Sequence, residues 1–364
     1  MKLKSLSLIQ INNHIILKTI WYYFWKLFLK IGLHFYSKKI IVSGKEQIPK
    51  KGAVLFMVNH PNGLIDPLMV TTHLPRINHY LVRAAVFKKP LIKKFLGTLN
   101  LMPIYRIRDG ASQLGKNQEI FENCFEIFKK GQTLMIFPEG SHNRKRTIRP
   151  LSKGFTRIVF GALDKYKDLK ITIIPVGLTY QNASQYPAKV AINYGTPILV
   201  NDFYNPKKTN ISVVQLKNEV SFQLKKLSVH IPDDESYKEV LAKLNKANVD
   251  FTQVESVNKM IVNQSFLELK PKTTHYLKPL FYLIIINSLL PYIIWKITSK
   301  KIDEIEFIDT FRFGLNAVTF PVFYIFQSLI IQSFWGWRIA GVYFFISLLL
   351  ILIHSKFSVT NSEV

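Results

Sequence analysis

Hydrophobic positions change their spacing repeatedly between residues 40 and 200. Short continuous apolar runs, typical of buried strands, alternate with stretches whose apolar residues recur on one face of a helix. The predicted strands are residues 53–58, 79–82, 101–105, 133–137, 171–176 and 190–194, and the predicted helices are residues 67–74, 91–97, 112–130 and 154–166. This alternation predicts an α/β fold with a largely parallel or mixed sheet flanked by helices, in which ligands bind where strands end.

The first 40 residues predict an amphipathic helix at a membrane surface. Lysines, among them Lys18, Lys26 and Lys30, interrupt the apolar residues of this segment, whose aromatic and aliphatic residues from Ile20 to Leu29 have helical spacing. No apolar run there is long enough to span a bilayer and no small-residue cleavage site follows, which argues against a removable signal peptide. Lysines among Trp and Phe are typical of a helix in the headgroup region. The alternative is a surface helix that packs only on its own domain.

Three apolar segments follow near the C-terminus, at residues 279–297, 313–332 and 336–353. Each is long enough to cross a bilayer, which takes about 20 residues, and Trp and Tyr lie near several of their ends. Lysines flank both ends of the first segment, so the positive-inside rule gives no orientation, and Pro291 and Pro321 are compatible with a kinked or re-entrant helix. The pattern predicts two or three spans.

The chain thus divides into four regions. Residues 1–40 form the amphipathic segment, residues 41–204 the α/β domain and residues 276–356 the transmembrane region. Residues 205–275, rich in Lys, Asn, Val and Glu, predict solvated helices that link or brace the other parts.

Charge adds information about the partner. The 364 residues include 49 Lys and Arg against 23 Asp and Glu, a net charge of +26, which indicates nucleic acid, an anionic membrane face or an acidic substrate. The basic residues are spread along the chain and no nucleic-acid-binding motif is present, so a membrane is expected and nucleic acid is not. The single cysteine, Cys124, excludes an intrachain disulfide and falls in a helical apolar series that predicts a core position.

The stretch NHPNGLIDP carries the first candidate chemistry. It follows the strand at 53–58; Pro61 disfavours a helical His60, and Asp66 before Pro67 predicts a helix start with Asp66 as the N-cap. A histidine at a strand end and a carboxylate at the next helix suit a general base and its orienting partner. A plain turn with a capping aspartate is the alternative.

Three further strand ends carry compatible groups. In IFPEGSHNRKR, residues 136–146, a turn exposes backbone N–H groups beside a carboxylate and three cations, a combination that suits a phosphate. MPIYRIRDG adds Arg106 and Arg108, and IIPVGL, residues 173–178, ends a fourth strand.

The order NHPNGLIDP, PIYRIRD, FPEGS and IPVGL resembles the four motif blocks of the glycerophosphate and lysophosphatidate acyltransferases, over about residues 40 to 200. The pairing of FPEGS with the His/Asp block is the specific part. Five residues separate His60 from Asp66, where the commonest form has four. The longer form resembles a branch that includes fungal glycerol-3-phosphate and dihydroxyacetone-phosphate acyltransferases, which also carry hydrophobic segments after the catalytic domain. The resemblance makes residues 41–204 an acyltransferase-type catalytic domain.

The resemblance implies transfer of an acyl group from acyl-CoA or acyl-carrier protein to a hydroxyl of glycerol 3-phosphate or 1-acylglycerol 3-phosphate, in the synthesis of phosphatidic acid. His60 would be the general base and Asp66 its orienting partner, with no acyl-enzyme, no metal and no resident cofactor. Glu139 would bind a glycerol hydroxyl or orient a neighbouring cation. The implied acceptor site comprises Arg106, Glu139, Gly140 and Ser141. Arg108, Arg144 and Lys153 would be secondary contacts to phosphate or thioester, with a solvated face as the alternative.

Other readings remain open. The acceptor could be another lysolipid or an amino-acid lipid, and the chain could be a non-catalytic membrane scaffold. A metal hydrolase would use His60, Asp66, His73 and His79, but their spacing matches no familiar metal site, and His73 is expected to cap a helix. The expected location is an integral membrane protein with its catalytic domain on the cytoplasmic face.

Overall fold

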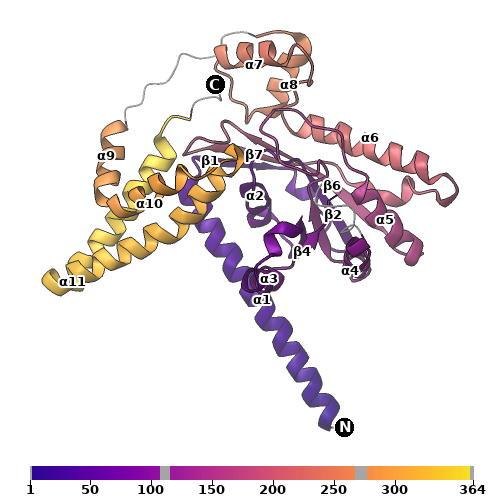
Figure 1. Ribbon diagram of the computed structural model, residues 1–364, viewed down its shortest axis with the longest axis horizontal. Helices are drawn as coiled ribbons and strands as arrows, with labels where there is room; N and C mark the ends of the chain where they lie inside the picture. Colours follow the sequence, from indigo (N-terminus) through magenta and orange to yellow (C-terminus); the bar gives the residue numbers. More distant parts are fainter. Residues whose placement is uncertain (1, 107–114, 267–276, 361–364) are drawn as a thin grey trace.

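The computed structural model describes residues 2–106, 115–266 and 277–360, with side chains from residue 15 onward. Its centre is an eight-stranded sheet with the order β1-β7-β6-β2-β5-β3-β4, in which β8 also pairs with β6 (Figure 1). The strands are β1 Lys39–Ser43, β2 Ala53–Val58, β3 Asn78–Arg83, β4 Leu101–Ile104, β5 Thr133–Ile136, β6 Ile171–Tyr180, β7 Lys189–Tyr194 and β8 Ile198–Leu199.

The sheet is mixed, which confirms the predicted fold class. Strands β2 to β6 pair in parallel, whereas β7 and β8 run antiparallel to β6, and β1 pairs in parallel with β7. The six predicted strands are present, and β6 extends four residues beyond its predicted end, to Tyr180. The sequence prediction missed β1, a short edge strand that begins with a lysine, and β8, which has two residues. Neither has the length of apolar run that identifies a buried strand.

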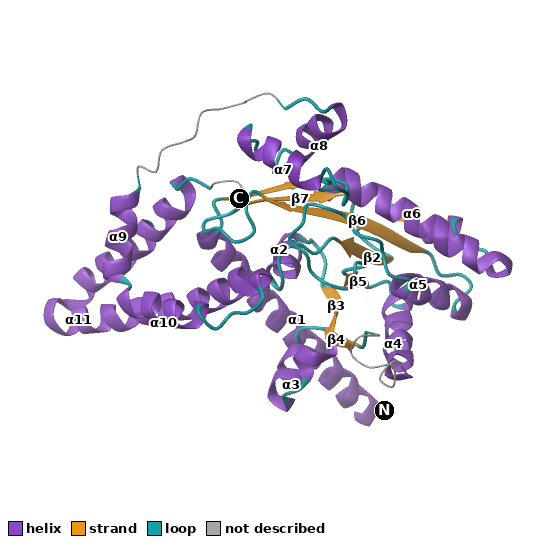
Figure 2. Cartoon of the chain, turned by 45° about the horizontal axis from the view of Figure 1, so that its top comes forward, coloured by secondary structure: helices purple, strands orange, loops and turns teal. Residues whose placement is uncertain are grey.

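Helices cover both faces of the sheet (Figure 2). One face packs against α4 Asn117–Lys129, α5 Gly154–Lys165 and α6 Thr209–Leu227, and the other against α1 Lys2–Tyr36 and α2 Ile65–His73. β2 is buried along its whole length, because alternate residues contribute to the two cores. Cys124 is fully buried in the first core, as predicted.

The predicted linking region contains two different parts. Helix α6 belongs to the sheet layers, where Leu216, Val220 and Leu224 are fully buried. Helices α7 Tyr237–Lys246 and α8 Val254–Asn263 form a second, small core with Ala191 of β7 at the upper edge of the domain in Figure 1.

The C-terminal apolar region folds back on itself. Helices α9 Lys278–Asn287 and α10 Leu289–Ser299 are bent by 98° at one break, so the first predicted segment is not a straight span. The other two segments are the arms of α11 Ile308–Phe357, which is interrupted at Gly336, with φ 79° and ψ 169°. By length and apolarity, the described residues contain one helix able to cross a membrane, Ile305–Phe357, or up to two candidates if the bent pair counts as one.

The two arms of α11 form a hairpin. The Tyr343 hydroxyl donates to Gln327 Oε1 at 2.8 Å, whereas in a straight helix these residues would lie about 24 Å apart. Both ends of α11 also return to the end of α1: Asp309 accepts a hydrogen bond from Tyr36, and Lys356 donates to His34 O at 2.6 Å. Gly336 permits the reversal because its positive φ is unfavourable for other residues.

Candidate active site

Three of the four strand ends predicted to carry chemistry, those of β2, β4 and β5, meet at the carboxyl ends of the parallel strands, whereas the fourth predicted end, at residues 173–178, lies within β6. β2 lies between β5 and β6, so its end at Val58 is flanked by the IFPEGS turn and by the middle of β6. The Asn59 side chain continues this pairing, since Oδ1 accepts from Leu178 N–H at 2.6 Å and Nδ2 donates to Leu178 O at 3.0 Å. The loop that carries His60 therefore starts from a fixed point on the sheet.

The five-residue spacing leaves His60 and Asp66 in direct contact. His60 Nδ1 lies 2.8 Å from Asp66 Oδ2, and the side chains are 17% and 0% exposed. A carboxylate acceptor selects the tautomer that carries its proton on Nδ1, so Nε2 is the nitrogen that can take up a further proton.

Asp66 lies inside α2, whereas the sequence predicted it as the N-cap. Leu64 occupies that position and α2 begins at Ile65, because the Asp66 carboxylate turns back toward the preceding loop. Oδ2 also accepts from the Asn62 N–H at 2.7 Å, and Oδ1 accepts from the Tyr180 hydroxyl at 2.8 Å. Burial and the nearby Asp66 charge hold the pKa of Tyr180 well above its usual value, so its hydroxyl stays a donor. Asn62 and Tyr180 were not among the predicted site residues.

The His60 ring is packed by the next motif. It stacks on Phe137 with ring centres 4.1 Å apart and makes a T-shaped contact with His142, with ring centres 5.7 Å apart. The His60 carbonyl accepts a hydrogen bond from the Asn143 N–H at 3.0 Å. The loop that carries His60 and the loop after β5 therefore pack and hydrogen-bond against each other.

Arg149, a residue outside the predicted set, organises the turn after β5. Its Nε donates to Glu139 Oε2 at 2.7 Å, Nη1 donates to Ser141 Oγ at 2.9 Å, and Nη2 donates to Ser141 O. The Glu139 side chain is only 4% exposed; burial raises its pKa, and the Arg149 cation partly opposes that shift. Of the two roles expected for Glu139, this contact corresponds to the orientation of a neighbouring cation.

Arg106 joins the end of β4 to the same turn. Its Nη1 donates to Gly140 O at 2.9 Å, and Gly140 has a φ of 74°, a conformation that favours glycine. Arg108, the other arginine of that block, lies outside the described residues.

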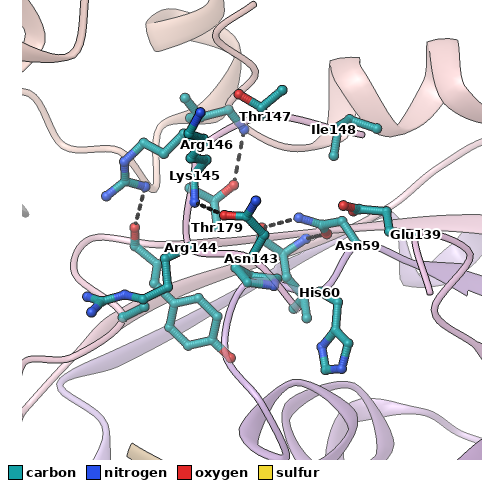
Figure 3. Close-up of a pocket in the computed structure, with 15 residues that line it drawn as sticks. Asn59, His60, Glu139, Asn143, Arg144, Lys145, Arg146, Thr147, Ile148 and Thr179 are labelled. Atoms are coloured by element: carbon teal, nitrogen blue, oxygen red, sulfur yellow. Dashed lines mark hydrogen bonds between the residues drawn. The ribbon is translucent and has the colours of Figure 1, made fainter. Parts of the chain in front are cut away.

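A pocket beside the dyad brings together three of the predicted residues, His60, Glu139 and Arg144 (Figure 3). Arg146 fixes the loop that forms its wall, because its guanidinium is buried and donates to two carbonyl oxygens at the end of β6, at 2.8 and 2.9 Å. Lys153 is exposed at the start of α5, next to Ser152, whose N–H donates to Pro138 O at 2.8 Å. That bond places the start of α5 beside the Glu139 turn.

The histidines of the metal-hydrolase alternative point to other partners. His73 Nδ1 lies 2.8 Å from Met69 O in its own helix, and His79 Nδ1 lies 3.2 Å from Thr133 O. Among the described residues there is no group of three or more His, Cys, Asp and Glu side chains that could hold a metal ion.

Comparison with known proteins points to one family. Residues 39–179 match the family model described as Acyltransferase. Glycerol-3-phosphate O-acyltransferase 1 of Saccharomyces cerevisiae is 26% identical over 122 residues, which are 32% of this chain and 16% of the yeast protein. The 1-acyl-sn-glycerol-3-phosphate acyltransferase of Borreliella burgdorferi is 26% identical over 175 residues, which are 48% of this chain and 64% of that protein.

Among solved structures, the crystal structure of a 1-acyl-sn-glycerophosphate acyltransferase from Thermotoga maritima overlaps with 52% of this chain and 73% of its own, with 18% identity and a TM-score of 0.37. This chain spans less than two thirds of the length of each of the two curated relatives named above, 16% and 64%. The region that matches the family model, residues 39–179, contains His60, Asp66 and the Glu139 turn, but not the C-terminal helices.

Proposed function

Because residues 39–179 match the family model described as Acyltransferase, we propose that this protein transfers an acyl group from a thioester to a hydroxyl of a glycerophosphate, either glycerol 3-phosphate or 1-acylglycerol 3-phosphate. The observation that carries the proposal is the His60–Asp66 pair at 2.8 Å, beside a pocket with basic walls.

His60 acts as the general base. Its Nε2 takes the proton of the acceptor hydroxyl as that oxygen attacks the thioester carbonyl, and Asp66 stabilises the imidazolium that forms. The tetrahedral intermediate then breaks its C–S bond, and the leaving thiolate takes the proton from His60. The acyl group passes directly to the acceptor, without an enzyme nucleophile. In keeping with this, Cys124 lies in the core and burial raises the pKa of its thiol to about 12.

The acceptor phosphate binds beside the Glu139 turn. Arg106, which donates to Gly140 O, and Arg144, which lines the pocket, supply positive charge, and Arg149 offsets the buried Glu139 carboxylate. Lys153, exposed at the start of α5, is a secondary contact to the phosphate or to the anionic donor. The donor is acyl-CoA or acyl-carrier protein, both of which bring strong negative charge to this basic protein.

The α11 hairpin crosses the bilayer twice. From Arg312 to the turn at Gly336 the helix rises about 36 Å, which exceeds a hydrocarbon core of about 30 Å. Trp335, Trp337 and Arg338 surround the turn, as expected for residues that reach the far interface. Both ends of α11 consequently lie on the side of the catalytic domain.

The α9–α10 pair enters the membrane and returns to the same side. Its break contacts both arms of the hairpin: Asn287 Nδ2 donates to Ser347 Oγ at 3.0 Å, and Ser288 Oγ lies 2.6 Å from the Tyr324 hydroxyl. These bonds supply the partners that polar groups at a helix break require inside a bilayer. Its outer parts return to the base of the hairpin, where Phe281 packs against His354 with ring centres 5.3 Å apart and the Arg312 guanidinium lies 5.1 Å from the centre of the Trp295 ring.

Helices α1 and α3 Pro90–Thr98 complete the membrane-facing surface. Trp21 donates to Thr98 Oγ1 at 3.0 Å and Trp25 packs on Phe95, so the exposed apolar side of α1 continues onto α3. In Figure 1, α1 and α11 both extend below the sheet domain, α1 toward the bottom of the view and α11 toward the lower left. Lys296, Lys300, Lys301 and Lys356 lie toward the base of the hairpin, which by the positive-inside rule favours the cytoplasmic face.

Labelling of single cysteines tests this topology. Ser333→Cys lies near the hairpin turn and Ser299→Cys near its base, and the buried thiol of Cys124 leaves a low background. In intact cells, a membrane-impermeant maleimide is expected to label the turn at once and the base only after permeabilisation. Labelling of both positions from the same side would contradict the two crossings.

Acyl transfer by the purified full chain tests the activity. Acyl-CoA and acyl-carrier protein are offered as donors, and glycerol 3-phosphate and 1-acylglycerol 3-phosphate as acceptors. His60→Ala is expected to lower kcat by at least about 10²-fold because it removes the general base, whereas His34→Ala, which changes an exposed histidine at the end of α1, is expected to keep the rate. Activity that survives in His60→Ala would overturn the mechanism, and absence of turnover by folded wild-type protein with either acceptor would overturn the proposed substrates.

A further inference from the structure

Residues 304–310, which end the connection from the α9–α10 pair and form the first turn of α11, lie against the proposed catalytic motifs. We call this segment the membrane strap. It lies more than 100 residues beyond the matched acyltransferase region, which ends at residue 179. It nevertheless contacts both the His60 loop and the loop after Glu139, as the following contacts show.

Asp309 reaches the His60 loop through Asn62. The Asp309 side chain is 1% exposed, and its Oδ2 accepts a hydrogen bond from Asn62 Nδ2 at 3.1 Å. Asn62 is itself buried, and its backbone N–H is one of the donors to Asp66 Oδ2. A continuous series of hydrogen bonds thus joins the strap to the carboxylate that orients His60.

The backbone of the loop also lies directly on the strap. Thr310 Oγ1 accepts a hydrogen bond from the Leu64 N–H at 3.1 Å. Gly63 has a φ of 43°, and a Cβ at this position would lie 2.8 Å from Glu306 O. The strap therefore fixes residues 62–64, which form the turn between His60 and Asp66.

A second set of contacts reaches the loop after β5. Glu304 Oε2 lies 3.1 Å from His142 Nε2, and the Phe307 ring packs on His142 with ring centres 4.9 Å apart. His142 in turn faces His60. The strap consequently contacts both the loop that carries His60 and the His142 side chain that packs beside the His60 ring.

We propose that Asp309 and Thr310 are positioning residues for the His60–Asp66 pair, so that catalysis depends on the C-terminal membrane segment. This inference rests on the proposed acyltransferase function. Asp309 and Thr310 act through Asn62 and Leu64 and do not touch substrate. Loss of their contacts is expected to lower the rate of the chemical step while leaving substrate binding nearly unchanged, because general-base catalysis requires the base within hydrogen-bond reach of the acceptor hydroxyl.

The main test compares Asp309→Ala, Asn62→Ala and the double variant. Each single change is expected to lower kcat by about tenfold to 100-fold with KM for both substrates within about twofold. Asp309→Ala also removes an acceptor of Tyr36 and Arg312, whereas Asn62→Ala leaves those contacts in place. The double variant is expected to have a kcat no lower than that of the slower single variant, since both changes break the Asn62–Asp309 hydrogen bond. Asp303→Asn is the matched control: it removes an exposed carboxylate six residues away and is expected to keep wild-type kcat.

Thr310 provides a pair of variants that leave the buried charge intact. Thr310→Val removes the acceptor of the Leu64 N–H with little change in shape, and Thr310→Ser restores it. We expect kcat to fall about threefold to tenfold in Thr310→Val and to recover in Thr310→Ser. Additive losses in the Asn62/Asp309 cycle, unchanged kcat in the strap variants, or losses confined to KM would overturn the inference.

Hydrogen exchange gives a readout that does not need turnover. The Leu64 amide is expected to exchange faster in Thr310→Val than in wild type, and to return to the wild-type rate in Thr310→Ser. Unchanged exchange would overturn the strap contact itself, whatever the activity. Wild-type protein that exchanges as expected but transfers no acyl group would instead overturn the proposed function, and with it the catalytic role given to the strap.

Discussion

Asp66 and Glu139 are two buried carboxylates at the same edge of the sheet, and each holds one basic side chain at almost the same distance. Asp66 Oδ2 lies 2.8 Å from His60 Nδ1, and Glu139 Oε2 lies 2.7 Å from Arg149 Nε. The partners differ in what they can do. Histidine exchanges a proton near neutral pH, whereas arginine keeps its charge. Similar geometry therefore supports proton transfer in the first pair and only orientation in the second.

The surroundings of the two pairs match these roles. Asp66 receives further hydrogen bonds from Asn62 and Tyr180, so it holds its position without depending on the charge of His60. Glu139 depends on one cation, and that cation also binds Ser141. Loss of a partner should consequently affect catalysis at Asp66 and folding at Glu139.

The largest expected effect on rate comes from Asp66→Asn. The amide keeps the size of the side chain but removes the charge that we propose stabilises the His60 imidazolium, so kcat should fall by about 10²-fold or more. Acyl transfer by purified protein measures this effect, with the exposed Asp168→Asn as the control. A variant that keeps more than half of the wild-type kcat would mean that Asp66 supports the turn and not the reaction.

Local sequence revealed one pair and not the other for a physical reason. His60 and Asp66 sit in one block whose turn and helix signals limit where they can lie, even though Asp66 proved to be inside α2 and not at its cap. Arg149 lies in an irregular segment between β5 and α5, where no periodic pattern indicates which way a side chain points.

Contacts between residues far apart in the sequence could not be predicted either, because no local pattern indicates them. Tyr180 meets Asp66 across 114 positions, and Asp309 meets Asn62 across 247. Such contacts depend on strand order and on how the C-terminal helices fold back. The apolar run of β2 was predictable because it is buried on both faces, but the break between α9 and α10 lies within a continuous apolar stretch. Hydrophobicity alone shows that this stretch avoids water, not that it turns.

Arg149→Ala tests whether the Glu139–Arg149 pair, unlike the His60–Asp66 pair, contributes mainly to the stability of the fold. The change leaves the Glu139 carboxylate buried without its cation, which is expected to lower the free energy of unfolding by about 3–5 kcal/mol. Thermal and denaturant unfolding measure it, with the exposed Arg157→Ala on α5 as the control. The double variant Arg149→Ala/Glu139→Gln should recover much of the loss, because no unpaired charge remains.

The pH dependence of the stability lost in Arg149→Ala tests whether the Glu139–Arg149 pair is held by charge. Burial raises the pKa of Glu139 in the folded protein, and removal of Arg149 should raise it further, since the cation opposes the shift. Between the unfolded and the folded pKa, the folded state binds more protons than the unfolded state, so its stability falls as pH rises through this window. The destabilisation by Arg149→Ala should therefore be small in acid, where Glu139 is protonated in both states, and should grow as pH rises above the unfolded value near 4.5. A loss of stability that stays constant across this range would mean that Arg149 acts through packing and the Ser141 contacts, and that Glu139 is not held by charge.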